Sequence, residues 1–146
     1  MIVVETANRS GADADEAAAA ELARGVLADE GIEDGELGIA FVGPDEMRML
    51  KREHLGIDEA TDVLSFPSDK SDSRIGDLAI SAARARAQAR RFGHSTEVEI
   101  RILMLHGVLH LTGLDHETDS GAMARAEKRW RARLALPNGL IERVQS

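Results

Sequence analysis

The feature that most constrains this chain is an apolar helical segment at residues 97–112, which carries two histidines four positions apart. Ser95 or Thr96 can cap its start, and Gly113 can adopt the left-handed conformation that ends a helix. Its apolar positions include Ile102, Leu103, Leu105, Val108, Leu109 and Leu111. We therefore expect a central helix around which the chain packs, and whose few polar side chains need partners.

Strand-like and helix-like segments alternate along the rest of the chain. Strands are predicted at residues 2–4, 37–43, 61–67 and 76–81, and helices at 13–30, 44–56, 81–92, 97–112 and 119–134. The polar residues 68–74 read as a loop. The order and the length of 146 residues predict one α+β domain over 1–146, with a four-stranded mixed sheet packed against about five helices.

The composition limits the chemistry that is open to this chain. It contains no cysteine, so a transition-metal site would have to use histidine and carboxylate ligands. The first ten residues lack the basic and apolar regions of a secretory signal, and no stretch is apolar enough to span a membrane. We therefore expect a cytoplasmic protein that has no membrane partner.

The net charge of −8 is unevenly distributed along the sequence. Residues 1–72 hold 6 Lys/Arg and 18 Asp/Glu, whereas residues 73–146 hold 12 and 8. One face could therefore accept a polyanion while another repels it. The alternative is that the asymmetry only reflects solvated surface.

Three of the five histidines lie between residues 106 and 116. His106 and His110 share one helix face, and a turn at Gly113 would let His116 reach the same ion. Three imidazoles with one open coordination position are typical of catalytic zinc. A lone histidine on an apolar helix is more often a core residue, but this spacing favours metal. Asp115 could orient a ligand or handle a proton, or simply stabilise the turn.

The same histidine spacing occurs in the metzincin proteases, which place a glutamate directly after the first histidine as the general base. Here that position is Gly107, which supplies no carboxylate. A metalloprotease is therefore the least favoured of the metal-dependent functions that we consider.

The segments HGVLHLTGLDHE, TDVLSFP and IGDLAIS together resemble the YbeY endoribonucleases, bacterial metal-dependent enzymes of rRNA maturation and ribosome quality control. The resemblance runs from the strand at 37–43 to the last helix, and the N-terminal third matches only in pattern. It implies that His106, His110 and His116 bind one Zn²⁺, although nickel also suits imidazole ligands. It further implies cleavage of single-stranded RNA, a role in 3′-end maturation of small-subunit (16S) rRNA, and association with the ribosome or its small subunit. No DNA substrate is expected.

One departure from this family concerns RNA binding. The family usually has an arginine six residues before the threonine of TDVLSFP, and this chain has Leu55 there. Arg52 lies on roughly the same helical face and could replace it as a phosphate ligand, or could be an ordinary solvated residue. Arg84 and Arg86, on the basic helix 81–92, are further candidates for binding RNA.

Two other functions stay open. The first is a non-catalytic ribosome-assembly factor with a structural ion, which the leucine at position 55 favours and an open coordination position disfavours. The second is a metal hydrolase of a small substrate, which would need a deep and narrow apolar pocket rather than an open groove.

Overall fold

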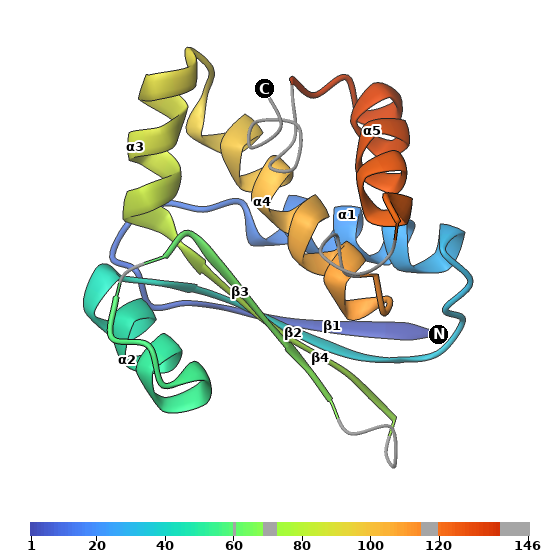
Figure 1. Cartoon of the computed structure of the whole chain (residues 1–146), viewed down its shortest axis with the longest axis horizontal. Helices are drawn as coiled ribbons and strands as arrows, with labels where there is room; N and C mark the ends of the chain where they lie inside the picture. The colour runs from blue at the N-terminus through green and yellow to red at the C-terminus, as the bar shows by residue number, and fades with distance from the viewer. Residues whose placement is uncertain (60, 69–72, 115–119, 138–146) are drawn as a thin grey trace.

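The computed structural model describes residues 1–59, 61–68, 73–114 and 120–137. Four strands and five helices follow one another in the predicted order (Figure 1). They are β1 (Ile2–Asn8), α1 (Glu16–Asp29), β2 (Gly35–Val42), α2 (Pro44–Leu55), β3 (Val63–Pro67), β4 (Arg74–Ser81), α3 (Ala82–Phe92), α4 (Thr96–Leu111) and α5 (Ala122–Leu134). The predicted α+β fold is confirmed.

The strands form one mixed sheet in the order β1-β2-β4-β3. β1 pairs with β2 and β2 with β4 in parallel, whereas the edge strand β3 runs antiparallel to β4. The parallel pairs are connected through helices, whereas only six residues separate the antiparallel strands β3 and β4 in the sequence, as these two kinds of pairing allow. β3 is an edge strand of this sheet. Its side chains alternate between the two faces of the sheet, so every second one faces α4.

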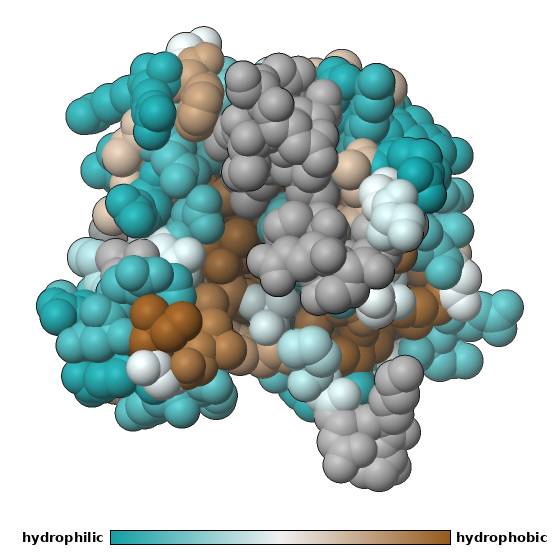
Figure 2. Space-filling model, viewed as in Figure 1, coloured by the Kyte–Doolittle hydropathy of each residue, from teal (hydrophilic) through white to brown (hydrophobic). Residues whose placement is uncertain are grey.

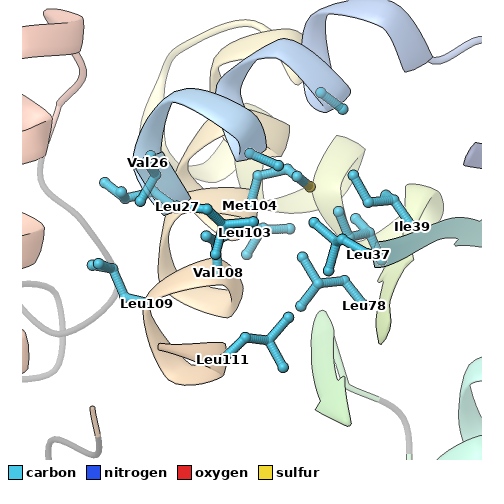
Figure 3. Close-up of a cluster of buried hydrophobic side chains, with 14 of the residues drawn as sticks. Val26, Leu27, Leu37, Ile39, Leu78, Leu103, Met104, Val108, Leu109 and Leu111 are labelled. Atoms are coloured by element: carbon cyan, nitrogen blue, oxygen red, sulfur yellow. The ribbon is translucent and has the colours of Figure 1, made fainter. Parts of the chain in front are cut away.

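α4 forms the centre of the core, as its apolar sequence predicts. Nearly all of its side chains from Glu99 to Leu111 are buried, and they pack with α1 against one face of the sheet (Figure 3). The labelled residues of this cluster come from α1, β2, β4 and α4. α2 lies across the opposite face, where Met47 packs with Val42, Leu64 and Ala79 (Figure 1). The sheet is thus covered unequally on its two sides.

Side-chain hydrogen bonds cap the starts of α1, α3 and α4, and at α4 they confirm Ser95 as the predicted cap. Asp15 accepts from the backbone of Ala18 at 3.0 Å, Ser81 accepts from Arg84 at 3.2 Å, and Ser95 accepts from Val98 at 3.1 Å. These side chains satisfy backbone N–H groups that lack a partner inside the helix.

Some boundaries differ from the prediction because pairing, rather than apolar content, sets strand length. β1 continues past residue 4 to Asn8, since Thr6 and Asn8 pair with Ile39 and Phe41 of β2. β4 begins at Arg74, within the segment predicted as a loop, and α5 begins at Ala122. Among the described helices, none combines the length and the apolar composition that crossing a bilayer requires.

Candidate metal centre

His106 and His110 lie one turn apart on the same face of α4, near its C-terminal end. The centroids of their rings are 4.8 Å apart, and the rings are inclined by 79° to each other. The structure therefore confirms that these two histidines are neighbours, which is the condition for binding one ion together.

Each of these rings is held through its Nδ1 atom. His106 Nδ1 lies 3.0 Å from Oε2 of Glu127 on α5, and the Glu127 side chain is only 1 % exposed. His110 Nδ1 lies 3.1 Å from the backbone oxygen of Leu114. Because both partners are acceptors, the neutral rings carry their proton on Nδ1 and the lone pair on Nε2. This arrangement is typical of histidines that bind metal through Nε2.

The turn that follows α4 positions the partner of His110. Gly113 has a φ of +100°, the left-handed conformation predicted for it, and its N–H donates to the oxygen of His110 at 3.1 Å. The chain then reverses, so that the oxygen of Leu114 meets the His110 ring.

The third predicted ligand, His116, and the candidate catalytic residue Asp115 lie outside the described residues. Their roles stay predictions. Within the described residues, no three His, Asp or Glu side chains form a group that could hold a metal ion. The described part of the site therefore supplies two imidazole donors from one helix.

The two histidines line an open pocket of about 480 Å³ between the ends of α2 and α4 and the start of β3. Its other lining residues are Leu55, Asp62, Val63, Leu64, Ser65, Pro67, Gly113 and Leu114. The region from Leu55 to Pro67 thus meets the C-terminal end of α4, about 40 residues further along the chain. None of the described lining residues is a lysine or an arginine.

Asp62 is a functional candidate that the sequence analysis missed. Its Oδ1 accepts from the backbone N–H of Val63 at 2.8 Å, and its Oδ2 accepts from Nε2 of Gln88 on α3 at 3.1 Å. The carboxylate is thus fixed at the edge of the pocket. The only sequence signal for it was its position at the start of the TDVLSFP strand.

Gly107 allows α4 to lie directly on the sheet. A Cβ at this position would meet Leu78 Cδ2 at 2.7 Å and Ser65 Oγ at 3.3 Å. Ser65 Oγ also donates to the backbone oxygen of Gly107 at 3.2 Å. Position 107 therefore faces β3 and β4, where a glutamate side chain has no space, and this geometry disfavours a metalloprotease further.

The structure separates the predicted RNA-binding residues from the pocket. Arg52, Arg84 and Arg86 are exposed, and none of them is among the residues that line it. Their role in binding RNA stays a prediction. Leu55, in contrast, does line the pocket, and 56 % of it is exposed.

Other cations near the end of α2 are paired with the segment that follows it. Arg48 Nε donates to Asp58 at 2.6 Å, and Lys51 Nζ donates to Glu59 at 2.8 Å. The hydrogen bond from Arg48 holds the pKa of the Asp58 carboxyl below its ordinary value, and the hydrogen bond from Lys51 has the same effect on the pKa of Glu59. These pairs neutralise both cations and tie residues 58 and 59 to α2.

Comparisons with known proteins agree with this architecture. A protein-family model described as "Endoribonuclease YbeY" matches residues 4–135, which extends the resemblance into the N-terminal third. An "Endoribonuclease YbeY" from Solibacter usitatus is 65 % identical over 106 residues, covering 73 % of this chain and 71 % of the relative. One from Chloroflexus aurantiacus is 41 % identical over 140 residues, covering 88 % and 91 %.

A solved structure shares the fold. The solution structure of a Thermotoga maritima protein superposes with a TM-score of 0.58 at 25 % identity, covering 91 % of this chain and 93 % of that one. The family match runs from within β1 to the end of α5. On these grounds, the chain belongs to the endoribonuclease YbeY family.

Proposed function

We propose that this chain is a metal-dependent endoribonuclease that hydrolyses phosphodiester bonds in single-stranded RNA. The observation that carries the proposal is the pair of histidines on α4, whose Nδ1 atoms are both engaged by acceptors. In a member of the endoribonuclease YbeY family, this pair at the edge of an open pocket supports hydrolysis. An open pocket also suits a polymer better than a small molecule.

His106 and His110 would hold the metal through Nε2, and His116 would be the third ligand. Zinc is the proposed ion, and nickel would suit the same donors. When bound, such an ion polarises a phosphoryl oxygen and lowers the pKa of a water molecule. The imidazole donors fit this role, because each ring already has the Nδ1 partner that metal-binding histidines usually have.

The other residues position these groups and handle the proton. Glu127 fixes the ring plane of His106 and increases the electron density on its Nε2. Asp62 presents a fixed carboxylate to the pocket and is one candidate for taking a proton from the attacking water. Asp115 is the other candidate, proposed from its place beside His116 in the sequence.

The proposed biological role is 3′-end maturation of small-subunit (16S) rRNA and ribosome quality control in the cytoplasm, with the ribosome or its small subunit as a partner. It is supported by the resemblance of the three sequence segments. Arg52, Arg84 and Arg86 are exposed and are proposed to bind RNA phosphates outside the pocket. Neither DNA nor a membrane is proposed as a partner.

A second candidate is a ribosome-assembly factor in which the ion is structural. The specific observation in its favour is Leu55, which gives the pocket an apolar wall where a phosphate-binding cation would be expected. A fourth protein ligand on the metal would support this candidate, whereas a water molecule or a small anion would support the nuclease.

The test combines metal analysis with cleavage of an end-labelled single-stranded RNA by the purified protein. We expect the wild type to contain one equivalent of metal and to cleave the RNA, and both chelation and His106→Ala to abolish cleavage. His54→Ala is the matched control. His54 belongs to α2 and contacts Phe66 on the face of the sheet opposite to α4, so it should be dispensable for cleavage.

Cleavage that survives both chelation and His106→Ala would contradict a metal mechanism. A wild type that never cleaves RNA, but whose melting temperature falls sharply on chelation, would support the structural ion instead. The His106→Ala preparation also reveals any contaminating nuclease, because a contaminant would act equally in both samples.

A further inference from the structure

Leu55 is an exposed apolar side chain inside the proposed active site. It is the last residue of α2, it is 56 % exposed, and it lines the same pocket as His106 and His110. It belongs to neither of the hydrophobic clusters described above. Figure 2 shows strongly apolar surface at the lower left, where Figure 1 places α2. Core packing therefore does not explain this leucine.

The backbone around Leu55 is held in place before any ligand arrives. Gly56 ends α2 with a φ of +70°, and its N–H donates to the oxygen of Arg52 at 2.9 Å. The ion pairs of Arg48 with Asp58 and of Lys51 with Glu59 tie the following residues back to the helix. Binding of a ligand on Leu55 would therefore cost little conformational entropy in the protein, because this segment is already ordered.

The charges of the pocket indicate which part of an RNA chain can bind at Leu55. Its described lining contains the carboxylate of Asp62 and no lysine or arginine, so apart from the proposed metal ion nothing in that lining attracts a phosphate to the surface at Leu55. The same lining contains four other apolar residues, namely Val63, Leu64, Pro67 and Leu114. A nucleobase fits better, because it combines an apolar face with N–H groups on its edge, which a carboxylate accepts.

We propose that Leu55 packs against the face of a nucleobase beside the scissile phosphate and thereby sets the affinity of this pocket for RNA. This inference rests on the proposed nuclease function of the same site. Leu55 acts here as a substrate-binding residue. Asp62 accepts a hydrogen bond from the edge of the same base, which leaves Asp115 as the candidate for taking the proton from the attacking water.

The test measures binding rather than cleavage. Fluorescence anisotropy gives the Kd of a labelled 2′-O-methyl oligonucleotide, checked on a gel to stay intact, and of a backbone of equal length without bases. We expect Leu55→Ser to weaken binding of the base-bearing oligonucleotide roughly tenfold and to leave binding of the base-free backbone unchanged. Leu55→Phe should tighten binding of the base-bearing form, because an aromatic ring stacks on any base.

Met49→Ser is the matched control, since Met49 is also an exposed apolar residue of α2, at 39 %, and does not line the pocket. It should change neither Kd, and thermal melting checks that all variants fold. Equal weakening of both ligands by Leu55→Ser, an unchanged Kd, or a wild type that does not prefer the base-bearing ligand would each overturn the inference. A wild type that binds bases through Leu55 but never cleaves RNA would support base binding by Leu55 and would contradict the nuclease.

Discussion

Within the described part of the chain, two buried glutamates hold histidine rings, and one of these two rings faces the pocket. Glu127 Oε2 lies 3.0 Å from His106 Nδ1, and Glu99 Oε1 lies 2.6 Å from His94 Nε2. Both carboxylates are buried, so each has a partner where an isolated charge would be costly. Of these two rings, His106 lines the proposed metal site and His94 does not. The pair of Glu99 with His94 therefore offers an internal reference for the pair of Glu127 with His106.

At this scale we predict that Glu127→Gln lowers zinc affinity by about 10-fold to 100-fold, because the amide orients His106 less firmly and withdraws the negative charge behind the ring. Competition with a chromophoric chelator measures this affinity. Glu99→Gln makes the same chemical change away from the pocket and should leave zinc affinity as it is. Equal zinc affinities in Glu127→Gln and Glu99→Gln would show that Glu127 is only structural.

The sequence predicted the residues of this site better than their partners. The spacing of His106 and His110 predicted a shared helix face, since helix geometry alone fixes it. Their partners were not predictable, because Glu127 lies 21 residues away from His106 on another helix, and the Asp62 carboxylate depends on Gln88, 26 residues distant. Such contacts are set by how elements pack and leave no periodic signal.

The contact between α4 and the sheet depends on a helical residue without a side chain. At Gly107 a Cβ would meet Leu78 Cδ2 at 2.7 Å, while at Gly25 of α1 it would meet no atom within 4 Å. Both glycines are interior to helices, where alanine is intrinsically more stable. The two positions therefore separate helix propensity from packing.

We predict opposite effects on the free energy of unfolding at these two glycines. Gly107→Ala should destabilise the protein by about 1–3 kcal/mol, because α4 must move off β3 and β4. Gly25→Ala should stabilise it by about 0.5–1 kcal/mol through helix propensity and reduced chain entropy. Urea denaturation followed by circular dichroism measures both values. A stabilising Gly107→Ala would mean that the helix tolerates a side chain against the sheet.

The kind and order of the elements were predictable because they follow from local patterns and capping residues. Ser95 marks a predicted helix start that the structure confirms, and Asp15 and Ser81 cap two other helices in the same way. The end of β1 was not predictable, because the polar residues Thr6 and Asn8 are in a strand only through pairing with β2. The position of β4 between β2 and β3 likewise comes from pairing.

Across the whole molecule, the fold partly neutralises the charge asymmetry of the sequence. Arg129 and Arg133 of the basic helix α5 form ion pairs with Glu30 and Asp29 at the end of α1, at 3.2 and 2.9 Å. Arg84 and Arg86 of α3 are exposed. α3 thus presents positive charge at the surface, and the hydrogen bond of its Gln88 with Asp62 links it to the pocket.

We predict that Arg86→Gln makes RNA binding less dependent on salt, whereas Arg129→Gln does not. The slope of log binding constant against log salt concentration should fall in magnitude by about 0.7 for each lost phosphate contact with a single strand. Binding of one labelled oligonucleotide between low and moderate salt measures the slope. Identical slopes in wild type and Arg86→Gln would remove Arg86 from the RNA-binding surface.

The hydrogen bond between His106 and Glu127 also has a consequence for protein synthesis. α5 follows α4 in the chain, so His106 leaves the ribosome before the carboxylate that orients its ring. A nascent chain that has released α4 but not α5 therefore presents His106 without the Glu127 carboxylate that orients its ring. Docking of α5 brings the Glu127 carboxylate to His106, which ties the support of this ligand to a chain in which α5 has been translated and folded.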